Sequence, residues 1–100
     1  MSVNSPVQPH DINTEKHFWN AFGNWEAEHS ANIIVRVCAK KGGWHSFSQE
    51  ELNEEVNGKF HFNGLIDQGH VLKDKGKGFF VTMEFIAKCW GSSPAKQEKS

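Results

Sequence analysis

Apolar residues in the first third of the chain recur at the spacing of a helix. Phe18, Phe22 and Trp25 stand at i, i+4 and i+7, which places their side chains on one face of an α-helix. We therefore predict a first helix over residues 13–28, capped by the asparagine or threonine at its start. Trp19 lies off the apolar stripe, so this helix is apolar on two sides.

The conformation of residues 31–40 is ambiguous. Ile33, Ile34 and Val37 fall on one helical face, whereas the density of β-branched residues favours a strand. The pair Gly42-Gly43 follows at once, and glycine is the commonest residue just after a helix. We predict a helix here and keep a strand as the alternative.

Three local signals mark a helix start near the middle of the chain. The Ser48 hydroxyl can accept from the Glu51 N–H while the Glu51 carboxylate accepts from the Ser48 N–H, which is a capping box. Phe47 and Leu52 have the spacing of a hydrophobic staple. Together these signals predict a helix over residues 49–56, which an Asn-Gly pair ends.

The last third of the chain predicts a helix, a hairpin and a second helix. The spacing of Phe62 and Leu65 predicts a helix over residues 60–68. Two apolar runs then flank a glycine-containing loop at residues 74–78, which is typical of a β-hairpin. Thr82 can cap a final helix that continues to about residue 91.

This layout resembles a winged-helix domain. The resemblance is carried by the helix ending at Lys40–Gly43, the capped segment Phe47–Leu52, the passage Leu65–Leu72 and the exit Gly78–Thr82. It implies a mainly α fold with a small β-hairpin, a winged helix-turn-helix with an extra N-terminal helix. We expect one domain over residues 13–91, between disordered polar tails at residues 1–12 and 92–100.

The resemblance also implies a DNA-binding function, as a small transcriptional or phage-type regulator. The third predicted helix would be the recognition helix and the hairpin loop would be the wing. The residues that would meet double-stranded DNA are Lys59, His61, Asn63 and Gln68 on that helix, and Lys73, Lys75 and Lys77 on the wing.

Charge leaves a second function class open. The formal net charge is −1 with histidine neutral, and residues 40–55 hold two lysines against four glutamates, which would repel phosphates. The alternative is a winged-helix protein–protein interaction module without DNA binding. Its partner surface, for another protein or for a homodimer, would be Phe18, Trp19, Phe22 and Trp25.

The sequence argues against catalysis and metal binding. Cys38 and Cys89 lie in apolar runs and are expected as core residues, with a disulfide as the alternative. The six histidines form no metal-ligand spacing, so we expect no metal, no cofactor, no small-molecule substrate and no enzymatic activity. No apolar run approaches the roughly 18 residues of a membrane span, and we expect a cytoplasmic protein.

Overall fold

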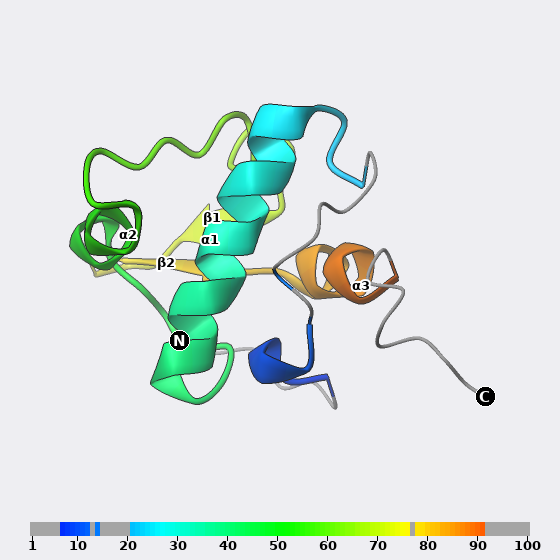
Figure 1. The fold of residues 1–100 in the computed structure, drawn as a ribbon, viewed down its shortest axis with the longest axis horizontal. Coiled ribbons are helices and arrows are strands. Elements are labelled where there is room, and N and C mark those ends of the chain that lie inside the picture. The colour runs from blue at the N-terminus through cyan, green and yellow to red at the C-terminus, as the bar shows by residue number, and fades with distance from the viewer. Residues whose placement is uncertain (1–6, 13, 15–20, 77, 92–100) are drawn as a thin grey trace.

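The computed structural model describes residues 7–12, 14, 21–76 and 78–91. In chain order its elements are a 3-10 turn η1 (Pro9–Asp11), helices α1 (Trp25–Lys41) and α2 (Gln49–Val56), strands β1 (Val71–Lys73) and β2 (Phe79–Val81), and helix α3 (Met83–Gly91). α1 crosses the middle of the molecule, with α2 on one side, α3 on the other and the hairpin behind it (Figure 1). The expected combination of helices with one small hairpin is confirmed.

α1 contains the segment whose conformation was ambiguous, and it is a helix. The Asn24 side chain accepts a 2.8 Å hydrogen bond from the Ala27 N–H at its start, and Gly42 ends it in the left-handed conformation (φ 86°). The β-branched residues at positions 33–35 are buried because α1 is covered on most of its surface. Burial against the rest of the fold thus outweighs their weak preference for a strand.

The predicted first helix over residues 13–28 is wrong for its described residues before Trp25. α1 begins only at Trp25, and residues 21–24 form a turn in which Gly23 has a φ of 93°. A left-handed glycine followed by the extended Asn24 cap interrupts helical geometry. Phe22 and Trp25 therefore do not share a helix face, and the predicted extra N-terminal helix is absent from these residues; positions 13 and 15–20 lie outside the described residues.

The predicted start of α2 is confirmed. The Glu51 N–H donates to Ser48 Oγ at 3.1 Å, and the Ser48 N–H donates to Glu51 Oε1 at 2.8 Å, which completes the capping box. Leu52 is fully buried, as the staple requires. Asn57 ends the helix with a φ of 56°.

The predicted third helix over residues 60–68 is wrong. Residues 63–69 are a series of turns, because Asn63 (φ 54°) and Gly64 (φ 93°) are both left-handed and no α-helix continues through two such residues. Turn hydrogen bonds hold the segment, among them Gln68 N–H to Gly64 O at 2.9 Å. The apolar spacing is still satisfied in part, since Leu65 is fully buried.

The hairpin and the last helix form as predicted. β1 and β2 pair antiparallel with Val71 opposite Val81. Outside the hairpin, Phe47 pairs with Phe79 through two backbone hydrogen bonds of 2.9 and 2.7 Å, so the segment before α2 lies along β2. Thr82 caps α3 by accepting the Phe85 N–H at 3.3 Å.

A single apolar cluster joins all of these elements. It contains buried residues of each helix and each strand, including Ile34, Leu52, Val71, Val81 and Phe85. Residues 7–12, which composition places in the N-terminal tail, also pack against the fold: two of them are buried, and Trp44 Nε1 donates to the Val7 carbonyl at 2.5 Å. The described part of the chain is thus one unit with one core.

Candidate interaction surfaces

The residues predicted to read DNA bases do not lie on one helix face. Asn63 Nδ2 donates to Ser30 Oγ at 2.8 Å, and that hydroxyl donates in turn to the His61 carbonyl at 2.6 Å. Gln68 Nε2 makes a longer hydrogen bond of 3.5 Å to the Phe22 carbonyl. Both side-chain amides are therefore bonded within the protein, while Lys59 and the His61 ring are exposed.

The predicted wing has an acidic residue between its lysines. Lys73 and Lys75 are exposed, and Lys77 lies outside the described residues. The Asp74 carboxylate accepts the Lys75 N–H at 2.7 Å and the Ser46 hydroxyl at 3.2 Å. The backbone hydrogen bond from Lys75 lowers the pKa of Asp74, so this carboxylate stays charged between the two lysines.

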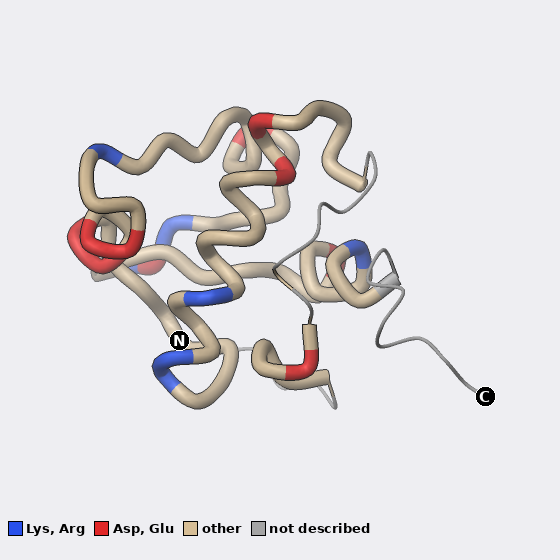
Figure 2. Tube along the Cα trace, in the orientation of Figure 1, with Lys and Arg blue, Asp and Glu red and all other residues tan. Residues whose placement is uncertain are grey.

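α2 carries the main acidic surface, and Figure 2 shows the acidic residues gathered on it. Two of its glutamates pair with the end of α1: Lys41 Nζ with Glu51 Oε2 at 2.6 Å, and Lys40 Nζ with Glu55 Oε1 at 2.5 Å. Burial opposes ionisation of Glu51, but the hydrogen bonds from Lys41 and Ser48 outweigh it and lower the pKa of Glu51. Glu50 and Glu54 are exposed on the same helix.

The predicted aromatic partner surface is divided. Phe22 is buried and packs against the rings of His70 and Phe85, so it cannot belong to an exposed surface of this structure. Trp25 is 59% exposed, and its ring stacks on His29 with the two planes 2° apart. Phe18 and Trp19 lie outside the described residues, so their part in this surface stays a prediction.

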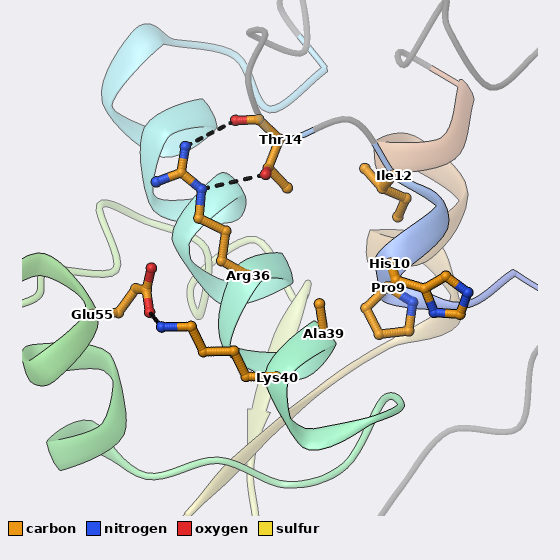
Figure 3. Close-up of a pocket in the computed structure, with 8 residues that line it drawn as sticks. All are labelled: Pro9, His10, Ile12, Thr14, Arg36, Ala39, Lys40 and Glu55. Atoms are coloured by element: carbon orange, nitrogen blue, oxygen red, sulfur yellow. Dashed lines mark hydrogen bonds and ion pairs between the residues drawn. The ribbon is translucent and has the colours of Figure 1, made fainter.

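A shallow groove of about 270 Å³ lies between η1, α1 and α2 (Figure 3). Arg36 donates from Nε and Nη2 to the hydroxyl and carbonyl of Thr14, at 3.3 and 3.2 Å. Lys40 and Glu55 close the other end with their ion pair, so opposite charges already neutralise each other there. No pattern in the sequence predicts this groove, because the composition of residues 7–12 predicts a disordered tail there.

A second surface that sequence reasoning missed lies on the hairpin. Leu72 is 44% exposed and stands opposite the half-buried Phe80, on the face of the hairpin that points away from the buried Val71 and Val81. We call Leu72 and Phe80 the outer hairpin face. The signal for it was the continuous apolar run in both strands, which gives each strand an apolar residue on both of its sides.

The two cysteines lie in the core of the fold. Cys38 and Cys89 are free and buried, as expected of core residues, and no disulfide joins them. Burial raises the pKa of Cys38 to about 12 and that of Cys89 well above its ordinary value, so neither forms the thiolate that a nucleophile or a metal ligand requires. Within residues 7–12, 14, 21–76 and 78–91, no group of three His, Cys, Asp or Glu residues could hold a metal ion.

Neither the length of the helices nor similarity to known proteins assigns this chain to a class of protein. In the described part of the chain, no helix has both the length and the apolar character needed to cross a membrane. Comparison with protein-family models, with curated proteins and with solved structures finds no match to this chain.

Proposed function

We propose that this chain is a winged-helix-type module that acts by binding another protein and does not read DNA bases. The observation that carries the proposal is the conformation of residues 60–69, which is not helical. A recognition helix presents free polar side chains to base edges in the major groove. Here the segment is a series of turns, and the amides of Asn63 and Gln68 are bonded to Ser30 and to the Phe22 carbonyl.

The order and pairing of the other elements support the winged-helix part of this proposal. α1 is followed by the short extended segment at Phe47, then by α2, and then by the hairpin whose second strand pairs with Phe47. The hairpin leads directly into a capped helix. Between α1 and α3, the departure from the expected pattern is at the place of the third helix.

Exposed apolar residues support the protein-binding part. The outer hairpin face is apolar, and Met83, at the start of α3, is 53% exposed. Aromatic residues and methionine are enriched at protein interfaces, and charged residues are depleted from interface centres. The acidic surface of α2 is a second argument against DNA, because the exposed Glu50 and Glu54 would repel phosphates that approach this helix.

DNA binding is the second candidate function, and one observation favours it. Lys73 and Lys75 are exposed on the hairpin and have no hydrogen bond or ion pair from their ammonium groups among the described residues. Lysines in such a place can neutralise phosphates without base contacts.

A salt titration of binding to random-sequence duplex DNA decides between the two functions. Phosphate-driven binding weakens linearly with the logarithm of salt concentration, and the slope falls by about one for each phosphate contact removed. We expect no such binding, and hence no difference between the wild type and a variant with Lys73, Lys75 and Lys77 changed to Ala. Salt-dependent binding that this variant loses would overturn the proposed function in favour of DNA.

A further inference from the structure

His70 is a buried histidine directly before β1, and one of its ring nitrogens has no hydrogen-bond partner in the described part of the chain. Its side chain is 3% exposed, and Nδ1 makes no hydrogen bond among the described residues. The backbone around it is firmly held: its N–H donates to the Leu65 carbonyl at 3.0 Å, and its carbonyl accepts the Thr82 N–H at 3.0 Å. The backbone of His70 is therefore held between the turn before it and the cap of α3.

The turn before α1 packs against the ring of His70 through Phe22. We call residues 21–24 the strap. The Phe22 ring meets the His70 ring edge to face, with centroids 5.2 Å apart, and lies 5.3 Å from the Phe85 ring. Two side chains hold the strap by its carbonyls: Lys88 Nζ donates to Ala21 O at 3.2 Å, and Gln68 Nε2 donates to Phe22 O at 3.5 Å.

We propose that His70 is an acid-sensitive latch whose protonation releases the strap from the corner between the hairpin and α3. A protonated imidazole carries a second N–H and a full charge, and a buried charge without a partner is costly. At this corner the strap is held by the packing of the Phe22 ring and by hydrogen bonds from the side chains of Lys88 and Gln68. His70 is instead tied by backbone hydrogen bonds to Leu65 in the preceding turn and to the Thr82 cap of α3. The strap is consequently the part that moves when water must reach the ring.

Burial and the nearby charges together disfavour protonation of His70 in the closed form. Burial lowers the pKa of His70 below its ordinary value of 6.5; Glu84 opposes the shift and Lys88 adds to it, and both of these residues are on α3. From the strap the neighbour is the uncharged Phe22, and from the turn before β1 it is the backbone of Leu65. The carboxylate of Glu84 therefore does not offset the loss of water around the ring.

The released form binds the extra proton more readily than the closed form does. Below the ordinary value of 6.5, the ratio of released to closed molecules should rise about tenfold per pH unit, until the lowered pKa of His70 in the closed form is reached. Above 6.5 the ratio should not depend on this histidine. Release would uncover Phe22 and Phe85, two aromatic rings that are buried in the closed form.

The test is an NMR titration of the full chain from about pH 8 to about pH 5. We expect the contacts of the Phe22 ring with His70 and Phe85 to weaken below pH 6.5, while the Phe47–Phe79 contact on the other side of the fold persists. His70→Phe keeps a ring against Phe22 but cannot be protonated, so it should remove the pH dependence. The control variant His61→Gln changes an exposed histidine, so its Phe22 contacts should depend on pH as they do in the wild type.

Three results would overturn the latch. The first is a His70 ring that titrates at its ordinary pKa with the Phe22 contacts intact. The second is loss of the Phe47–Phe79 contact in parallel with the strap contacts, which would mean that the whole domain unfolds. The third is unchanged pH dependence in a folded His70→Phe variant. If that variant does not fold, Glu84→Gln replaces it: removal of this carboxylate should lower the pKa of His70 further and increase release at low pH, and no increase would contradict the proposal.

Discussion

The side-chain amide of Asn63 is bonded to the hydroxyl of Ser30, at 2.8 Å and across 33 positions of the chain. Asn63 adopts the left-handed conformation at the start of the turns, and Ser30 lies in the second turn of α1. This hydrogen bond holds the segment after α2 against α1. The same hydrogen bond occupies the Asn63 amide, which is the group that a recognition helix would present to a base. One contact therefore both stabilises the turns and removes a side chain that could read DNA.

Asn63→Ala should therefore destabilise the fold. The variant loses the bond to Ser30, which contributes about 0.5–1.5 kcal/mol, and places a Cβ-bearing residue without a local hydrogen bond at a φ of 54°, which costs a further 1–2 kcal/mol or so. Asn63→Gly removes the bond but tolerates the backbone conformation, so it should lie between the wild type and the alanine variant. Denaturant unfolding measures both, and equal stability of all three proteins would show that the contact is not structural.

Ser48→Ala should weaken the start of α2. The variant removes the oxygen that accepts the Glu51 N–H, and loss of such a cap costs about 0.5–2 kcal/mol. Ser48→Thr retains the hydroxyl and serves as the control. An alanine variant with an unchanged free energy of unfolding would mean that the capping box contributes nothing in solution.

Gly78→Ala should separate the hairpin from the segment before α2. A Cβ at this position would lie 2.8 Å from the Phe47 carbonyl oxygen, which is bonded to the Phe79 N–H and cannot withdraw freely. Overpacking of this kind costs about 1–3 kcal/mol. Gly76→Ala is the matched control, because no atom lies within 4 Å of its Cβ position, and a surface change of that kind is usually within about 0.5 kcal/mol.

The pairing of Glu51 with Lys41 should make stability depend on acid pH. The pKa of Glu51 is lower in the fold than its ordinary value of 4.5, so its contribution is complete above pH 4.5 and is lost as the pH falls through the lowered value. Lys41→Gln should reduce the free energy of unfolding by about 0.2–1 kcal/mol at neutral pH and by less in acid. Lys59→Gln is the control, since Lys59 is exposed and has no ion pair among the described residues; an equal effect in both variants would contradict the role of the pair.

Signals confined to a few neighbouring residues predicted this fold well. Apolar spacing agreed with the helix found at residues 31–40 but predicted helices over residues 13–28 and 60–68 wrongly. The capping box at Ser48 and the cap at Thr82 are each set by atoms within three residues, so the sequence located them correctly. The spacing of Phe62 and Leu65 suggested a helix, but the pair Asn63-Gly64 between them is left-handed. An Asn-Gly pair also ends α2, at Asn57-Gly58. The pair Asn63-Gly64 is therefore a sequence signal against a helix over residues 60–68.

Contacts between distant parts of the chain could not be predicted. The bond from Asn63 to Ser30 and the packing of His70 on Phe22 depend on how the turns fold back on α1 and on the strap, and no spacing rule encodes that. The outer hairpin face was missed for another reason. An apolar run predicts a strand equally well whether one or both of its sides are covered, so it does not show that Leu72 is left exposed.

Site-specific photocrosslinking tests the proposed function most directly. A photoreactive phenylalanine analogue is placed at Leu72 on the outer hairpin face, and, as the matched control, at the exposed Glu54 on α2. The two variants are irradiated in the source cells and, separately, as purified protein at high concentration, where only a second copy can be captured. We predict one discrete protein adduct from position 72 and none from position 54. Adducts from neither position, together with salt-dependent binding to duplex DNA, would contradict the proposal that this module works through protein contact.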